Sequence, residues 1–149
     1  MKAIGTWKGG NQTRLEDGRG HSLIVDLPAD EGGRDLGPSA LELSVLSLAG
    51  CVTTIFALVA KKRKLTFEAM TIGLEARRPA GSPTITSVAG TLHVVTAAPM
   101  DEVQDTLDIT LRTCPVGVLF EHAKIPIQVH AIVTPPVSDQ IEVALLNRS

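Results

Sequence analysis

The residues of this chain best suited to chemistry are its only two cysteines. Cys51 lies inside the uncharged run LSLAGCVTTIFALVA, and Cys114 opens the segment Cys-Pro-Val. In a reducing cytosol, a pair of cysteines is more often catalytic or redox-active than permanently bonded. Free cysteine also serves as a small buried apolar residue. The pair therefore indicates thiol chemistry, with inert core packing as the alternative.

The two cysteines are expected in different surroundings. Pro115 favours the first position of a helix, which would put Cys114 at the N-cap. There, free backbone N–H groups and the helix dipole would lower the pKa of the Cys114 thiol. Cys51 lies within a helical run, where its neighbours within one turn are uncharged: Ser47, Leu48, Thr54 and Ile55. Any group that activates Cys51 must come from another segment or another chain.

Composition narrows the classes of function. The length of 149 residues fits a single domain, 1–149. Aromatic residues are 3% with no tyrosine, so stacking on bases is not expected, and a net charge of −2 disfavours a nucleic-acid partner. The N-terminus lacks the apolar stretch of a signal peptide, so we expect a cytoplasmic protein. The four histidines have no metal-ligand spacing with the cysteines, so no metal or cofactor is expected.

The longest predicted element is a helix around Cys51. Ser39 and Glu42 form the pattern S-x-x-E, a capping box, so a helix should begin there and end near Lys64. Residues 43–60 carry no charge over 18 residues, a borderline length for a membrane span. Serine, threonine and glycine within this run favour a buried central helix over membrane insertion.

The remaining elements alternate between strands and helices. Period-two patterns predict strands, and Met100 begins a run with helical spacing. Gly90 is expected to mark a β-bulge. The predicted strands are 3–7, 21–27, 70–77, 84–96 and 125–133, the helices are 100–113 and 115–122, and 135–149 is a tail. Strands grouped in runs with helices between them predict an α+β fold rather than a doubly wound parallel sheet.

Two sequence segments together resemble the OsmC/Ohr family, the osmotically inducible protein C and organic hydroperoxide resistance proteins. The resemblance covers about residues 1–134 and rests on Gly37-Pro38, Leu41-Glu42-Leu43, Leu48-Ala49-Gly50-Cys51 and Cys114-Pro115-Val116. It implies an intertwined homodimer, in which antiparallel sheets surround long buried central helices. It also implies a thiol peroxidase in which Cys51 attacks an organic hydroperoxide and becomes sulfenic acid. Cys114 would then form a disulfide with Cys51, and an external dithiol would reduce it.

In this family an arginine and a glutamate support the reactive thiolate. Arg34 matches the arginine of osmotically inducible members and Arg14 that of hydroperoxide resistance members; we favour Arg34. The glutamate is Glu42, nine residues before Cys51, whereas the best-characterised branches have it ten residues before, where this chain has Leu41. Nine residues turn a straight helix through half a circle and rise about 13–14 Å, so Glu42 would act across a dimer interface. The alternative is that Glu42 only caps the helix.

The sequence is therefore compatible with two functions. The first is a peroxidase for organic hydroperoxides, with no membrane or nucleic-acid partner. The second is a dimeric protein of the same fold that binds a small molecule or senses redox state without significant turnover.

Overall fold

The computed structural model describes residues 1–137. The chain divides into two compact units, Met1–Leu46 and a larger unit that begins at Ser47. The expectation of one domain over 1–149 stays a prediction. From residue 138 onward, the predicted tail lies outside the described residues.

The first unit contains a small antiparallel sheet in the order β1-β2-β3. Gly9 and Gly10, both with positive φ, form the turn between β1 and β2, because glycine adopts that backbone region without steric cost. β2 has no counterpart among the predicted ranges. The bounds are Ile4–Gly9 for β1, Gln12–Glu16 for β2, Ser22–Val25 for β3 and Ala29–Glu31 for the short 3-10 helix η1.

The helix predicted around Cys51 is α1, Ala40–Arg63. Its buried residues repeat every four positions, which gives one apolar stripe: Leu48, Val52, Phe56 and Ala60. Leu46 and Leu58, outside the stripe, are 55% and 53% exposed. We expected this helix to be buried on nearly all sides. Within this chain it is buried along only one side. By length and composition alone α1 could cross a membrane, a test that core helices of soluble proteins also pass.

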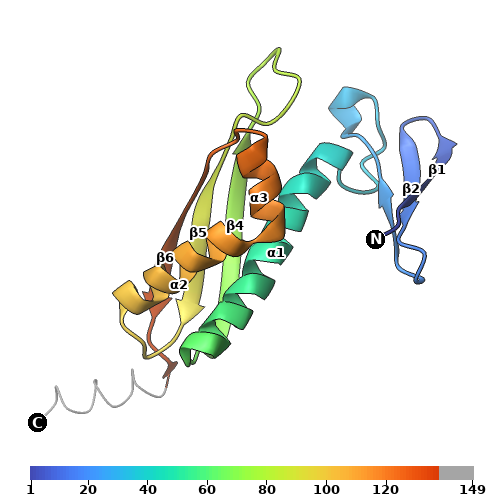
Figure 1. Ribbon diagram of the computed structural model, residues 1–149. Coiled ribbons are helices and arrows are strands. Elements are labelled where there is room, and N and C mark those ends of the chain that lie inside the picture. Colours follow the sequence, from blue (N-terminus) through green and yellow to red (C-terminus); the bar gives the residue numbers. More distant parts are fainter. Residues whose placement is uncertain (138–149) are drawn as a thin grey trace, which may run out of the picture. The chain divides into compact units, whose positions relative to one another are not determined.

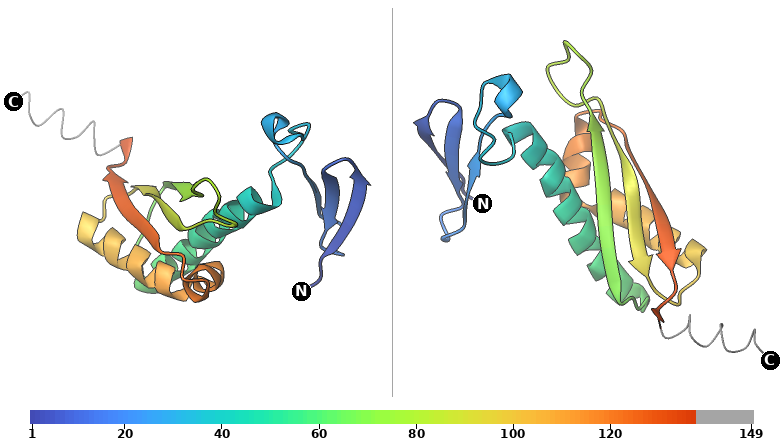
Figure 2. Two further views of the ribbon diagram at one scale, coloured as in Figure 1. Left: turned by 90° about the horizontal axis from the view of Figure 1, so that it is seen from above. Right: turned by 180° about the vertical axis from the view of Figure 1, so that it is seen from behind.

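The sheet of the second unit has the order β4-β5-β6. β4 (Ala69–Arg77) and β5 (Ser87–Val95) form an antiparallel hairpin, whereas β5 and β6 (Ile127–Thr134) are parallel. The prediction of antiparallel sheets is wrong for this last pair. A parallel pair requires a crossover, here made by α2 (Met100–Thr113) and α3 (Pro115–His122). The helices of this unit lie on one face of the sheet (Figures 1 and 2).

The core of the second unit lies between that face and the helices. Leu92 and Val94 of β5 are buried, as are Val103 and Leu107 of α2. Gly90 pairs with Leu74 in unbroken register, so the predicted bulge is wrong. A Cβ at residue 90 would collide with a backbone carbonyl of β4, and this close approach explains the glycine. The α+β class is confirmed, with two sheets and three α-helices in the described residues.

Candidate active site

Cys51 lies in α1 at the flank of the buried stripe and is half-buried. It precedes Val52, which is fully buried, and Ile55 follows it by one helical turn. The uncharged sequence around it forms helix because its apolar side packs against the core of the second unit. Cys51 therefore lies at the boundary between that core and the less buried side of the helix.

Cys114 lies at the junction of α2 and α3. The residue before a proline disfavours helical backbone, and Cys114 accordingly adopts φ −68° and ψ 115°. α2 ends there, and Pro115 takes the first position of α3. The Sγ of Cys114 accepts a hydrogen bond from the backbone N–H of Gly117, at 3.4 Å. The predicted N-cap is confirmed.

The fold brings the two cysteines together, although they are far apart in sequence. Both are free thiols, and their side chains are hydrogen-bonded to each other. Because this bond raises the pKa of Cys114, it favours the protonated form of that residue.

The expected lowering of the Cys114 pKa is wrong. Burial, together with the hydrogen bond to Cys51, raises the pKa of the Cys114 thiol to about 11, although the N–H groups of Gly117 and Val116 act in the opposite direction. The side chain is fully buried, so desolvation of a thiolate outweighs the N-cap donors. At neutral pH, Cys114 is a protonated thiol next to Cys51.

An apolar groove adjoins the segments that carry the cysteines. It has a volume of about 380 Å³ and is lined by Ile55, Leu58, Val59, Lys62, Arg63, Ile109 and Thr113. Ile55 is one turn from Cys51, and Thr113 immediately precedes Cys114. Hydrocarbon from a ligand could therefore bind beside both segments and leave water.

Glu42 forms the predicted capping box. The backbone N–H of Ser39 donates to Glu42 Oε2 at 2.7 Å, and the backbone N–H of Glu42 donates to Ser39 Oγ at 3.2 Å. These contacts with the backbone and side chain of Ser39 lower the pKa of Glu42. The carboxylate is thus already engaged at the start of α1.

Arg34 lies in the loop before α1. Its guanidinium has no hydrogen-bond or salt-bridge partner among residues 1–137. Arg14, the other candidate, lies on β2 and is paired with Glu16 at 3.2 Å. A free guanidinium remains available to support a thiolate, so the preference for Arg34 is maintained as a prediction. Arg34 and Glu42 belong to the first unit, whereas both cysteines belong to the second.

Asp26 organises the loop that carries Arg34, and sequence reasoning missed it. This buried carboxylate accepts backbone N–H groups from Leu27, Arg34 and Leu36 and the side-chain amide of Gln12. Burial alone would raise the pKa of Asp26, but these donors lower it overall. The signal in the sequence is an aspartate that ends a strand and precedes a glycine-rich loop, a position where Asp often binds nearby backbone N–H groups.

Among residues 1–137, no group of three or more histidine, cysteine, aspartate or glutamate side chains could hold a metal ion. The arrangement offers one half-buried thiol, one buried thiol that interacts with it, and an apolar groove lined by residues of the same two segments.

Solved structures share this fold. An OsmC-like protein from Mycoplasma pneumoniae superposes with a TM-score of 0.76 at 12% identity, covering 90% of this chain and 95% of that chain. An organic hydroperoxide resistance protein OsmC from Legionella pneumophila superposes with a TM-score of 0.67 at 19% identity, covering 90% of this chain and 97% of that chain. An organic hydroperoxide resistance protein from Elizabethkingia anophelis superposes with a TM-score of 0.65 at 17% identity, covering 91% of this chain and 97% of that chain.

The sequence comparisons identify the family. No curated protein sequence matches this chain. The family model described as OsmC-like protein matches residues 32–130, a range that includes both cysteines, Arg34 and Glu42. This chain therefore belongs to the OsmC-like protein family.

Proposed function

We propose that this protein is a thiol peroxidase that reduces organic hydroperoxides through a cycle of two cysteines. The observation that carries the proposal is the interaction between the Cys51 and Cys114 thiols, which are far apart in sequence. It pairs a half-buried sulfur with a buried partner thiol that can trap its oxidised form. Membership of a family that includes hydroperoxide resistance proteins supports the same function.

In the first step, the Cys51 thiolate attacks the terminal oxygen of the hydroperoxide. The O–O bond breaks, a proton converts the departing alkoxide to an alcohol, and Cys51 becomes sulfenic acid. The unpaired guanidinium of Arg34 is our candidate for the source of thiolate stabilisation.

In the second step, the Cys114 sulfur attacks the sulfur of the oxidised Cys51. Water leaves, and the Cys51–Cys114 disulfide forms. Because burial raises the pKa of Cys114, this thiol stays protonated until its neighbour is oxidised. An external dithiol then reduces the disulfide by two exchange steps and is itself oxidised to a disulfide.

The groove beside the cysteines supports an organic substrate. Its aliphatic residues include Ile55, Leu58 and Ile109, which would contact the hydrocarbon part of a peroxide. Burying each CH₂ group stabilises a complex by about 0.8 kcal/mol, a gain that hydrogen peroxide cannot obtain. Bulky organic peroxides should therefore react faster than hydrogen peroxide.

A homodimer in the cytoplasm belongs to the same proposal. The family is generally dimeric. Leu46 and Leu58, more than half exposed on α1, would then be covered by a second copy. A reducing compartment would return the disulfide to thiols between turnovers.

Steady-state turnover tests the proposal. The reduced protein is mixed with cumene hydroperoxide or hydrogen peroxide, with dihydrolipoamide as the dithiol, and peroxide loss is followed. Cumene hydroperoxide should be consumed faster, and Cys51→Ser should abolish consumption. Equal rates for the parent and Cys51→Ser would disprove the peroxidase and leave the redox-sensing or ligand-binding alternative.

A further inference from the structure

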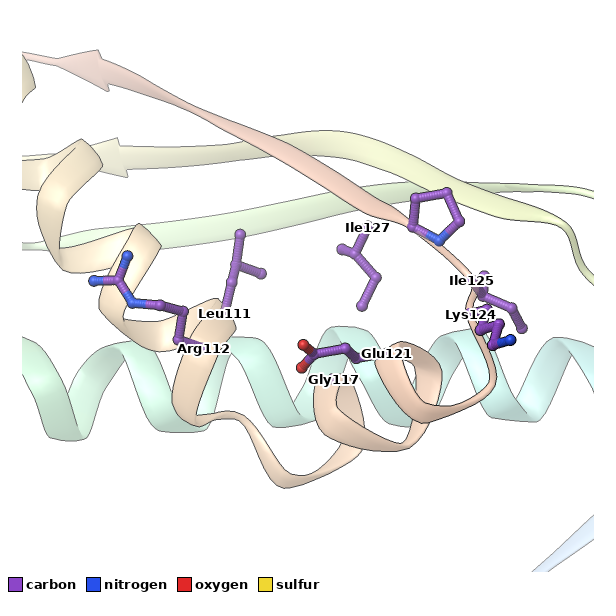
Figure 3. A pocket seen from close by; sticks show the side chains of 8 residues that line it. Leu111, Arg112, Gly117, Glu121, Lys124, Ile125 and Ile127 are labelled. Atoms are coloured by element: carbon purple, nitrogen blue, oxygen red, sulfur yellow. The ribbon is translucent and has the colours of Figure 1, made fainter.

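A second groove lies between the end of α2, α3 and the segment that leads into β6. It has a volume of about 430 Å³, within the size range of small-molecule sites, and it is shown in Figure 3. Its lining combines aliphatic and charged side chains: Leu111, Arg112, Gly117, Glu121, Lys124, Ile125, Pro126 and Ile127. None of these residues belongs to the apolar groove described above.

The charged groups of this groove are unpaired. The Glu121 carboxylate points into the hollow between Leu111 and Ile127, while Arg112 and Lys124 lie at its two ends (Figure 3). None of these three charged side chains has a hydrogen-bond or salt-bridge partner within residues 1–137. A carboxylate flanked by two separate cations, all three free, presents both signs of charge to a ligand.

The apolar part of the lining adds a second requirement. Leu111, Ile125 and Ile127 are each partly exposed, although aliphatic side chains gain from leaving water. A ligand that satisfies the whole groove needs an ammonium group for Glu121, a carboxylate for a cation, and hydrocarbon between them. A fatty acid lacks the ammonium group, and an alkylamine lacks the carboxylate.

We propose that this groove binds a short apolar peptide with free termini. The ammonium terminus would pair with Glu121, and the carboxylate terminus with Arg112 or Lys124. Aliphatic side chains of the peptide would cover Ile125 and Ile127. Each ion pair would also be a charge-assisted hydrogen bond, which is stronger than a neutral one.

Gly117 connects this groove to the thiol chemistry. It lines the groove, and its backbone N–H donates to Cys114 Sγ at 3.4 Å. A side chain at residue 117 would reach the carbonyl of Leu111 at 3.3 Å, so glycine keeps this wall of the groove open. A bound peptide would therefore contact the residue whose N–H donates to the Cys114 sulfur.

Three matched probes test the proposal by isothermal titration of the reduced protein. Leucyl-leucine carries both terminal charges, its N-acetyl derivative lacks the ammonium, and its amide lacks the carboxylate. We expect leucyl-leucine to bind at least about tenfold more tightly than either derivative. Absence of saturable binding below about 10 mM, or equal affinity for the three probes, would overturn the proposal.

Charge-neutralising variants assign each terminus. Glu121→Gln should weaken leucyl-leucine and its amide by about tenfold and leave the N-acetyl derivative unchanged. The double variant Arg112→Gln/Lys124→Gln should weaken leucyl-leucine and the N-acetyl derivative instead. Glu75→Gln, an exposed position on β4, is the matched control and should change nothing. Weaker binding in the control, or unchanged binding of leucyl-leucine in Glu121→Gln, would refute the assignment. No peroxide is present, so failure here leaves the peroxidase proposal untouched.

Discussion

The capping box at the start of α1 allows the role of Glu42 to be decided by substitution. Glu42→Gln keeps an oxygen that can accept the N–H of Ser39, because glutamine also completes this motif. The same change removes the negative charge that a catalytic carboxylate would need to orient an arginine. Glu42→Ala removes both the acceptor and the charge.

The hydrogen bonds of the box set the magnitudes. Ser39→Ala deletes the acceptor of the 3.2 Å bond from the Glu42 N–H, and loss of such a cap costs about 1 kcal/mol. Glu42→Ala deletes the 2.7 Å bond from the Ser39 N–H and should cost a similar amount, about 1 kcal/mol. Glu42→Gln loses only the favourable interaction of charge with the helix dipole, about 0.3–0.5 kcal/mol at this exposed position.

Urea unfolding and peroxidase kinetics measured on the same variants separate the two roles. If Glu42 is only a cap, Glu42→Gln should lose the least stability, and Ser39→Ala and Glu42→Ala should lose more, by similar amounts. The kcat/KM for cumene hydroperoxide should then stay within about twofold for all three, well under 1 kcal/mol in barrier height. Ser39→Ala is the control, because it weakens the cap and keeps the carboxylate.

The pH dependence provides an internal check. Hydrogen bonds from Ser39 lower the folded-state pKa of Glu42 below its ordinary value of 4.5. A lowered pKa gives stability that is present above 4.5 and is lost as pH falls through the folded-state pKa. The stability gap between the parent and Glu42→Gln should therefore shrink in acid. A loss of kcat/KM greater than about tenfold in Glu42→Gln alone would refute the capping account and favour a catalytic carboxylate.

Three further results are expected. Asp26→Ala should speed hydrogen exchange at the Arg34 amide about tenfold, because the buried acceptor of that N–H is lost. Unchanged exchange would contradict the role given to Asp26. Cys51→Ala should lower the pKa of Cys114 from about 11 but leave it above 9.0, since burial is the larger cause of the raised pKa. Thiolate absorbance measured against pH would show this, and a Cys114 pKa that does not move would rule out the contact between the two sulfurs. Gln104→Leu should lower the free energy of unfolding in urea by about 1–3 kcal/mol. The reason is that Gln104 Oε1 accepts the backbone N–H of Ala131 in β6 at 2.9 Å, and this N–H would be left without a partner. A change under about 0.5 kcal/mol would count against that contact.

Local patterns predicted the elements that carry the chemistry. Pro115 correctly indicated the start of α3 and the N-cap position of Cys114, because proline restricts the backbone within one residue. Ser39 and Glu42 correctly indicated the start of α1 for a similarly local reason. Such signals depend on neighbours in sequence, so they can be interpreted without the fold.

The misjudged features depend on residues that only the fold brings together. The pKa of Cys114 rises because it is buried beside Cys51, and neither fact is visible near Pro115. The parallel pairing of β5 and β6 depends on the path of α2 and α3, which strand patterns do not specify. Asp26 has its role because three backbone N–H groups converge on it from the loop that follows.

The most direct test of the central claim is a single-turnover count of thiols. The reduced protein is mixed with one equivalent of cumene hydroperoxide, quenched within seconds, and its free thiols and peptide masses are measured beside Cys51→Ser and Cys114→Ser. The account predicts loss of both thiols and a Cys51–Cys114 disulfide in the parent, an intact Cys114 in Cys51→Ser, and sulfenic acid at Cys51 in Cys114→Ser. Thiols that persist for many minutes in the parent would contradict it.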